Sequence, residues 1–329
     1  MNFGWITLDL ITTQDWTVQD LEMILQKAKE LKKNRIISDE LKGKTFVMIF
    51  YNPSTRTRNS FAIAMTELGG FPLFFEAQRM WLGQQSESPK DTAKVISRYA
   101  SGLGIRIFPN ITKWQYGASH QIVQELAKWA DIPLINLEDD MYHPCQALSD
   151  IFTIREKKKN LAGKKFVLSW AYHPKPLPVS VPNSTVLTMT RFGLDVTLLH
   201  PTKFELDKKI LTSAKKNAKE SGGSFEIVNS LEDGYRDADI VYVKSWGSLK
   251  EYGNFPAEKK IRAPYRGKWT IDEAKMELTK TDSIFMHCLP IRRNIVVTDD
   301  VVDGPHSIVY DQAENRLHVQ KAILLSLLK

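Results

Sequence analysis

Short apolar runs typical of buried β-strands alternate with helical patterns along nearly the whole of this 329-residue chain. Such alternation predicts parallel sheets covered by helices on both faces, because parallel strands are joined by crossover connections. One series of runs precedes a helix that starts near Cys145, and the pattern restarts after Gly163. We therefore expect two doubly wound α/β domains, residues 1–150 and 151–329, with a C-terminal helix over about 312–329 that returns to the first domain.

The expected strands are four in the first domain and five or six in the second. They are Thr45–Phe50, Pro72–Phe75, Gly104–Phe108, Pro133–Leu137, Lys165–Trp170, Asp195–Leu199, Ser224–Val228, Asp239–Val243, Ser283–Met286 and Ser307–Tyr310. The expected helices lie near 54–68, 88–101, 118–130, 180–193, 206–221 and 312–328.

Composition excludes several classes of protein. The 45 basic and 38 acidic residues leave a net charge of +7, but most lysines lie on the solvent side of helix patterns, and no nucleic-acid module is present. Two cysteines form no disulfide framework, and no signal peptide or membrane span is evident, so we expect a cytoplasmic protein. No zinc-like spacing and no G-x-G-x-x-G after a strand occurs, so neither a metal nor a nucleotide cofactor is expected.

A cluster of anion-binding side chains follows the first expected strand. Ser54-Thr55-Arg56-Thr57-Arg58 comes directly after Tyr51-Asn52-Pro53 and opens a helix. The N–H groups at a helix N-terminus, three hydroxyls and a guanidinium would then meet at one point. This combination suits a phosphate dianion.

Two further strand ends of the first half carry candidate side chains. Arg106 lies within the apolar run GIRIF, so it must pair with either a structural carboxylate or an anionic ligand. After the fourth strand, Pro144 begins a helix and places His143 and Gln146 at the N-terminus of that helix. A neutral histidine in that position can donate a hydrogen bond to an oxyanion.

The second half carries polar residues at corresponding places. Tyr172-His173-Pro174-Lys175 follows one strand, Lys244-Ser245-Trp246-Gly247 another, and His287-Cys288-Leu289-Pro290-Ile291-Arg292-Arg293 a third. No base or orienting residue adjoins Cys288 in the sequence, so a small packed side chain is favoured over a thiolate nucleophile.

Taken together, S-T-R-T-R at 54–58, H-P-x-Q at 143–146 and H-C-L-P at 287–290 resemble the aspartate/ornithine carbamoyltransferase family over essentially the whole chain. The resemblance implies a first domain that binds carbamoyl phosphate, a second that binds an amine, no cofactor, and a homotrimer with shared active sites. It implies Arg106, His143, Thr57 and Gln146 as catalytic residues. The carbamoyl phosphate residues would be Ser54, Thr55, Arg56, Thr57, Trp81, Arg106, His143, Gln146, Cys288, Leu289 and Arg316, with Gln84 of a neighbouring subunit as a further candidate. The amine residues would be Glu138, His173, Lys244, Leu289, Pro290 and Arg292.

The amine-side motif is similar to the N-acylornithine branch of this family. Lys244 stands where enzymes acting on free ornithine meet its α-ammonium, and like charges repel. An N-acylornithine is therefore the expected substrate. N-acetylornithine comes first, because the tail Glu314–Ala322 resembles the acetylornithine enzymes, with N-succinylornithine and then ornithine as alternatives. Glu87, Pro89 and Val296 are the candidates for reading the acyl group. A non-catalytic binding protein of the same fold is the alternative from a different class.

Overall fold

The computed structural model of the chain describes residues 9–82 and 86–329. The chain forms two compact units: one contains the residues up to Phe152 together with Glu314–Lys329, and the other is Thr153–Ala313. All strand pairs in both units are parallel, which confirms the predicted α/β class.

The first unit contains a four-stranded sheet in the order β2–β1–β3–β4. Its strands are β1 (Thr45–Phe50), β2 (Phe71–Glu76), β3 (Gly102–Arg106) and β4 (Leu134–Glu138). Because all four run in parallel, the segments that follow Phe50, Arg106 and Glu138 lie at one edge of the sheet.

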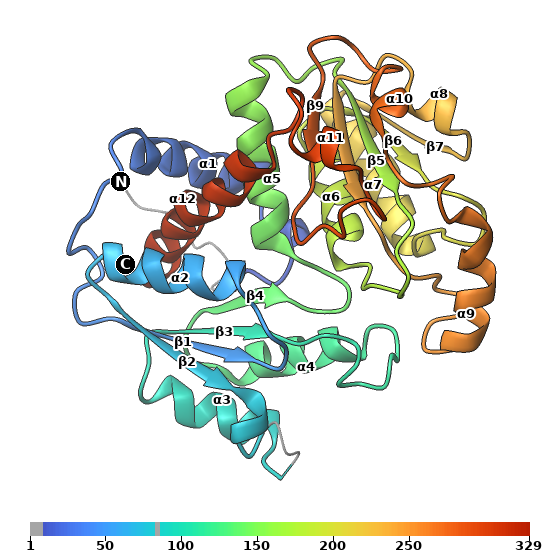
Figure 1. The fold of residues 1–329 in the computed structure, drawn as a ribbon. Coiled ribbons are helices and arrows are strands. Elements are labelled where there is room, and N and C mark those ends of the chain that lie inside the picture. Colours follow the sequence, from blue (N-terminus) through green and yellow to red (C-terminus); the bar gives the residue numbers. More distant parts are fainter. Residues whose placement is uncertain (1–8, 83–85) are drawn as a thin grey trace. The chain divides into compact units, whose positions relative to one another are not determined.

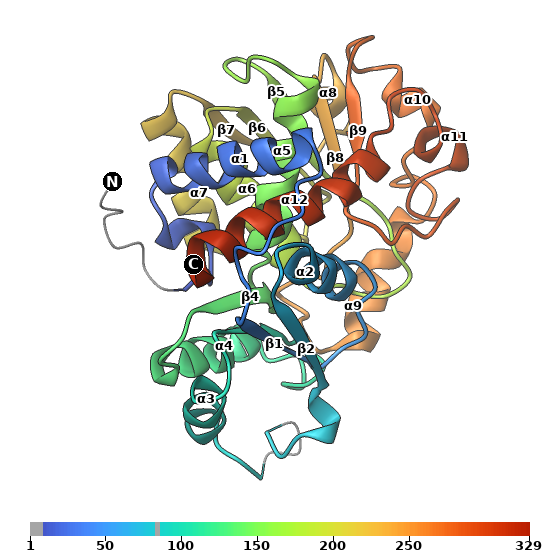
Figure 2. The ribbon, with the colours of Figure 1, turned by 90° about the vertical axis from the view of Figure 1, so that its left-hand side faces the viewer.

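Helices cover both faces of this sheet, as Figures 1 and 2 show. On one face, α3 (Pro89–Ser97) and α4 (Ala118–Trp129) bury Ala93, Ile96, Val123 and Leu126 against the strands. On the other face lie α2 (Arg56–Glu67) and α12 (Val309–Leu328). The remaining elements up to Phe152 are η1 (Thr13–Asp15), α1 (Val18–Lys33), η2 (Ala77–Arg79) and the start of α5 (Pro144–Lys157).

The α1 helix illustrates how local sequence sets these elements. Thr17 and Asp20 form a reciprocal capping box at its start. Its buried face carries Leu21, Ile24, Leu25, Ala28 and Leu31 at helical spacing, as predicted, whereas Lys32 and Lys33 lie in the last turn, next to the negative end of the helix dipole.

The second unit contains a five-stranded sheet in the order β7–β6–β5–β8–β9. Its strands are β5 (Lys165–Trp170), β6 (Asp195–Leu199), β7 (Ser224–Val228), β8 (Ile240–Lys244) and β9 (Ile284–Met286). Three of them match the predicted bounds residue for residue, because each is a short, mostly apolar run bounded by polar or turn residues. The helices of this unit are α6 (Ser180–Arg191), α7 (Lys208–Ser221), α8 (Leu231–Tyr235), α9 (Phe255–Arg262), η3 (Ala263–Tyr265), α10 (Glu273–Met276) and α11 (Asp299–Val302).

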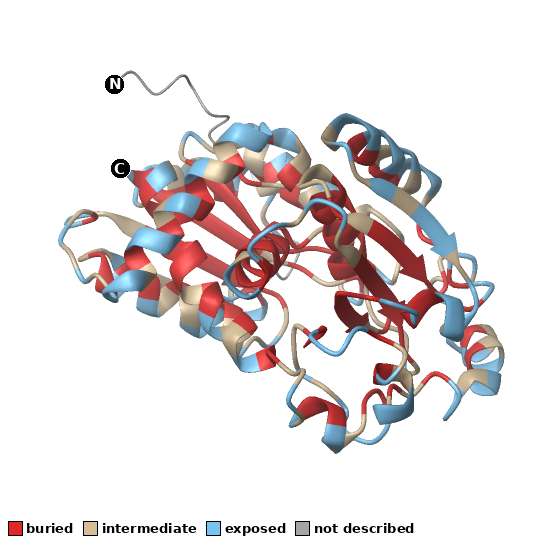
Figure 3. Cartoon of the chain, turned by 90° about the horizontal axis from the view of Figure 1, so that it is seen from above, coloured by how far each residue is buried: buried red, intermediate tan, exposed pale blue. Residues whose placement is uncertain are grey.

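Buried residues make up most of the central strands of the two sheets. Figure 3 shows that the central strands are buried, while the outer faces of the helices are exposed. No helix among the described residues is long and apolar enough to cross a membrane.

The predicted strand Ser307–Tyr310 is wrong. Ser307 makes only an isolated parallel bridge to Phe285, and Val309 already begins α12. The apolar pair Ile308–Val309 imitates a strand, but both residues are buried, at the point where the chain enters a 20-residue helix. The β-branched pair is therefore buried where the helix begins, and the long helical segment that follows decides the structure against the local β-like composition.

Candidate functional site

The segment after β1 reaches a helix N-terminus within a few residues. Pro53, Ser54 and Thr55 separate the strand from α2, which begins at Arg56. Thr55 occupies the N-cap position but makes no capping hydrogen bond with its side chain. The Ser54 hydroxyl instead accepts from the Arg58 N–H at 3.4 Å, and buried Thr57 lies in the same first turn, at the positive dipole end of α2.

Arg106, the last residue of β3, joins two of the predicted residues. Its Nη1 donates to the Ser54 hydroxyl at 2.5 Å, and its Nη2 lies 2.8 Å from Oε2 of Glu138. The same carboxylate oxygen lies 3.7 Å from Nε2 of His143. The strand-end arginine therefore meets a carboxylate, and Ser54, Arg106, Glu138 and His143 form one cluster, which we call the Arg106 cluster.

A second set of contacts centres on Arg316, which comes from α12. Its Nη2 donates to the Thr57 hydroxyl at 3.0 Å, and its Nη1 donates to Oε1 of Gln146. The Gln146 amide in turn donates to Asp150 at 2.7 Å. Arg316 is buried, and this burial lowers its pKa. It therefore fixes the predicted residues Thr57 and Gln146 from the far end of the sequence.

The turn that carries Glu138 and His143 is held by Asp139, which sequence reasoning missed. Its buried carboxylate accepts from the backbone N–H groups of Met141 and Tyr142 at 2.7 and 2.6 Å, and from the Asn136 amide at 2.9 Å. It also lies 2.6 Å from Nδ1 of His120. The signal in the sequence was three consecutive acidic residues at the end of a buried strand, where a carboxylate needs several partners.

Two side chains in contact with this turn, His120 and Asp140, have raised pKa values. Burial opposes the charge of His120, but the hydrogen bond and negative charge of Asp139 outweigh it and raise the His120 pKa. Burial, and then the neighbouring Asp139 charge, raise the pKa of Asp140 to about 6, although Asp140 accepts from the N–H groups of Gly117 and His120.

Three other predicted residues of the first unit take no part in the hydrogen bonds and ion pairs of these two clusters, among the described residues. Trp81 is 67% exposed, after η2. Glu87 accepts a hydrogen bond from Thr92 at 2.8 Å, and Pro89 is the first residue of α3. Within the described part of the chain, no hydrogen bond or ion pair joins any of the three to Arg106. Gln84 lies outside the described residues.

In the second unit, His173 follows β5, and Lys244 is the last residue of the neighbouring strand β8. β5 and β8 pair at Trp170 and Lys244, and His173 comes three residues after Trp170. Nδ1 of His173 lies 2.7 Å from the Lys175 carbonyl. Burial, and then the positive charges of Arg292, Lys244 and Arg262, lower the His173 pKa to about 4. His173 is therefore neutral near pH 7, in surroundings that favour a negatively charged ligand.

The segment after β9 contains the remaining predicted amine-side residues, which differ in burial and in their partners. His287 accepts from the Leu289 N–H at 2.9 Å, and Leu289 has a positive φ of 55°. Arg293 is paired with Asp299 and Asp303, whereas Arg292 is exposed. Val296 is buried, and its carbonyl accepts from the Ile271 N–H at 3.0 Å. Cys288 and Pro290 lie in the same segment, half-buried and exposed respectively.

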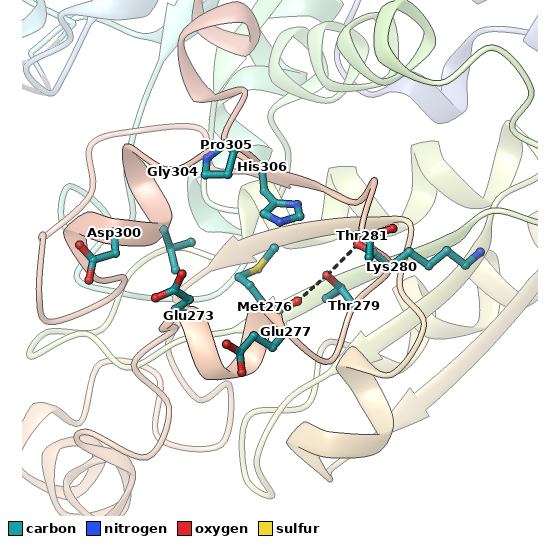
Figure 4. A pocket seen from close by; sticks show the side chains of 11 residues that line it. Glu273, Met276, Glu277, Thr279, Lys280, Thr281, Asp300, Gly304, Pro305 and His306 are labelled. Atoms are coloured by element: carbon teal, nitrogen blue, oxygen red, sulfur yellow. Dashed lines mark hydrogen bonds between the residues drawn. The ribbon is translucent and has the colours of Figure 1, made fainter.

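A separate pocket of about 340 Å³ in the second unit lies between α10, α11 and the segment before β9 (Figure 4). Met276, Thr279, Lys280 and His306 are among the residues that line it. It contains none of the predicted site residues. Among the described residues, no group of His, Cys, Asp and Glu side chains could hold a metal ion.

Comparison with known families matches both halves of the chain. Residues 8–156 match the model described as the aspartate/ornithine carbamoyltransferase, carbamoyl-P binding domain. Residues 179–327 match the aspartate/ornithine carbamoyltransferase, Asp/Orn binding domain.

Individual relatives cover nearly all of the chain. The N-acetylornithine carbamoyltransferase of Xanthomonas axonopodis pv. citri (strain 306) is 42% identical over 96% of this chain and 95% of its own length. The ornithine carbamoyltransferase of Pyrococcus horikoshii is 40% identical over 97% and 95%.

Two solved structures have the same fold. An acetylornithine transcarbamylase complexed with acetylcitrulline matches with a TM-score of 0.91 and 39% identity, over 97% of this chain and 98% of that one. A mutant N-acetyl-L-ornithine transcarbamylase, with serine in place of a glutamate, is complexed with carbamyl phosphate and N-succinyl-L-norvaline. It matches with a TM-score of 0.92 and 41% identity, over 97% and 99%.

Proposed function

This chain belongs to the aspartate/ornithine carbamoyltransferase family, and we propose that it transfers the carbamoyl group of carbamoyl phosphate to the δ-amine of N-acetylornithine. The products are N-acetylcitrulline and phosphate. A relative that is 42% identical over almost the whole chain is named N-acetylornithine carbamoyltransferase, and a structure of the same fold holds acetylcitrulline.

The observation that carries the proposal is the Arg106 cluster beside the first turn of α2. A guanidinium, a hydroxyl and an imidazole from three segments lie at one edge of the sheet. We assign the phosphate to Ser54, Thr55, Arg56 and Thr57, because a helix N-terminus with hydroxyl and guanidinium donors favours a dianion.

In the proposed reaction the neutral δ-amine attacks the carbamoyl carbon. A C–N bond forms, the carbonyl oxygen becomes an oxyanion, and the C–O bond to phosphate then breaks. Arg106, His143 and Thr57 donate to the oxyanion, and Gln146 and the carbonyl groups of Cys288 and Leu289 accept from the carbamoyl N–H groups. The leaving phosphate takes the amine proton, so the proposal assigns no protein base. Positioning and charge stabilisation supply the rate.

We assign the amine substrate to His173, Lys244, Leu289, Pro290 and Arg292, with Glu138 as a further contact. The positive charges that lower the His173 pKa support this assignment, since an acylated ornithine has lost its α-ammonium but keeps its carboxylate.

Acetyl is the proposed acyl group, and succinyl is the second candidate. The succinyl alternative is supported by the similar structure in which serine replaces a glutamate, because that protein binds N-succinyl-L-norvaline. Glu87, Pro89 and Val296 remain the proposed residues that read this group. Val296 is buried, so its side chain would act through packing.

We further propose a cytoplasmic homotrimer with shared active sites. The edge strand β2 exposes Phe71 and Phe75, and Trp81 is exposed nearby in sequence, which supports a partner surface on this unit. Two free cysteines support a reducing compartment.

The test is a side-by-side assay with N-acetylornithine, N-succinylornithine and ornithine at equal concentration, with carbamoyl phosphate in excess. We expect the highest turnover with N-acetylornithine. Highest turnover with either of the other two would reassign the substrate. Tight binding of carbamoyl phosphate without a citrulline-type product from any amine would identify a non-catalytic protein of this fold.

A further inference from the structure

Arg262, the last residue of α9, is a buried arginine in the second unit that no predicted motif contains. It is 1% exposed, and so is its partner Glu258, one helical turn earlier. Nε of Arg262 lies 3.0 Å from each carboxylate oxygen of Glu258, and Nη2 donates to the same carboxylate. A buried ion pair is costly to desolvate, so its retention needs further hydrogen bonds.

Those hydrogen bonds lead to the two strand-end loops that carry the proposed amine residues. Nη1 donates to the carbonyl oxygen of His173 and to the hydroxyl of Ser245, both at 3.2 Å. Nη2 donates to the carbonyl oxygen of Trp246 at 2.9 Å. With Glu258, these acceptors use every N–H group of the guanidinium.

The acceptors adjoin Lys244 in sequence or are part of the site itself. Ser245 and Trp246 directly follow Lys244, and His173 is itself an amine-side residue. The indole of Trp170 reinforces this link, because its Nε1 donates to the same Trp246 carbonyl at 3.0 Å. We call the segment from Ala171 to Lys175 the His173 loop and the segment from Lys244 to Gly247 the Lys244 loop. One side chain from α9, which Figure 1 shows as a separate helix of this unit, therefore joins the two loops.

We infer that Arg262, held by Glu258, is a positioning residue that fixes the His173 and Lys244 loops in the geometry that binds the amine substrate. The inference rests on the proposed function, because it concerns the amine side of that reaction. Arg262 itself touches neither substrate nor reacting atoms in this proposal. Its effect on the reaction passes through the backbone of His173 and Trp246.

The surroundings of the guanidinium explain why arginine is required. Its Cζ lies 5.3 Å from the ring centroid of Trp170 and 5.2 Å from that of Phe204. A planar cation can lie among aromatic rings and donate in its own plane to several loops at once, whereas a lysine ammonium has fewer donors and no fixed fork. A lysine at this position keeps the charge but cannot hold both loops.

The experiment compares Arg262→Lys with Arg236→Lys in the full-length protein. Arg236 forms the same i,i+4 pair with Glu232, at 2.5 Å, but both side chains are more than half exposed. For Arg262→Lys we expect the KM for N-acetylornithine to rise about tenfold, the equivalent of one hydrogen bond, with the KM for carbamoyl phosphate unchanged within about twofold. Arg236→Lys is expected to leave both values unchanged.

The outcomes separate the inference from the proposed function. If wild type carbamoylates none of the three amines, the proposed function is wrong. If wild type is active and Arg262→Lys lowers only Tm, or raises both KM values in proportion, the positioning role is wrong. Should Arg262→Lys not fold, Ser245→Ala is the second variant. It removes one hydrogen bond of Arg262 and keeps the buried ion pair with Glu258. A rise of about threefold in the amine KM is then expected, and an unchanged amine KM overturns the inference.

Discussion

The guanidinium of Arg106 and the carboxylate of Glu138 lie 2.8 Å apart, at the ends of the neighbouring strands β3 and β4. Both side chains are mostly buried, with 13% and 9% exposure. Glu138 also lies 3.7 Å from His143, so one carboxylate orients two of the groups to which we assign the oxyanion. Glu138 is therefore expected to act in the proposed chemistry by orienting Arg106 and His143.

Glu138→Gln should lower kcat/KM for carbamoyl transfer by roughly ten- to hundredfold. Glutamine keeps the shape of the side chain, but its neutral oxygen holds the Arg106 guanidinium less firmly, a loss of about 1.5–3 kcal/mol. Steady-state kinetics with both substrates measures the effect. Glu232→Gln is the control, since it removes the same charge from an exposed pair and should leave the kinetics as in wild type. Unchanged kinetics in Glu138→Gln would exclude the orienting role.

Arg56→Ala should weaken the use of carbamoyl phosphate by about 2–5 kcal/mol in kcat/KM, because it removes a charged contact to the proposed phosphate site. Arg58→Ala is the matched control, two residues further along α2. The Arg58 guanidinium stacks on Phe74, with Cζ 3.6 Å from the ring centroid, and is not assigned to the phosphate. Steady-state assays of both variants with N-acetylornithine measure the difference. Turnover of Arg56→Ala within a few-fold of wild type would refute the phosphate assignment.

The fold was largely predictable because its strands are short apolar runs with clear boundaries. The third strand was expected at Gly104–Phe108, but β3 ends at Arg106. The need of this arginine for a partner was predicted, but the sequence could not identify that partner as Glu138. The error at Ser307–Tyr310 has a similar cause: local composition does not show that Val309 is already buried within α12.

Contacts between distant positions were the least predictable part of the candidate site. Arg316 was assigned from the resemblance alone, and only the structure shows that it contacts Thr57 and Gln146. Arg262 shares the last turn of α9 with Lys259 and Lys260, and the sequence alone does not distinguish its buried guanidinium from exposed cations. Periodicity indicates which face of a helix is buried, but it does not identify the acceptors that a buried charge will meet.

Glu67→Gln should destabilise the first unit by about 3–5 kcal/mol, because it leaves the ammonium of Lys321 buried without its charged partner. Lys321 is fully buried on α12, and its Nζ lies 3.0 Å from Glu67 Oε2. Glu40→Gln is the control, since Glu40 pairs with the exposed Lys329 and should cost at most about 1 kcal/mol. Urea unfolding followed by circular dichroism compares the variants. Equal losses for both would show that the buried pair has no special weight.

The cluster of His120, Asp139 and Asp140 should make stability depend on pH. The folded-state pKa values of His120 and Asp140 are both raised, the latter to about 6. A raised folded pKa means that the folded state holds its proton more tightly than the unfolded state. The stabilisation is therefore complete below the unfolded pKa and is lost as pH rises through the folded pKa. For Asp140 this window runs from about 4 to about 6, and for His120 it begins near 6.5.

Asp140→Asn isolates the first of these windows. Since one pKa unit corresponds to about 1.4 kcal/mol, wild type should lose roughly 2–3 kcal/mol of stability relative to Asp140→Asn between pH 4 and pH 7. His120→Asn should instead alter the pH dependence above pH 6.5, because it removes the group that titrates there against Asp139. Urea unfolding of the three proteins at pH 4, 5.5, 7 and 8.5 measures both windows. A free-energy difference between wild type and Asp140→Asn that stays constant from pH 4 to pH 7 would show that Asp140 titrates alike in the folded and unfolded chain.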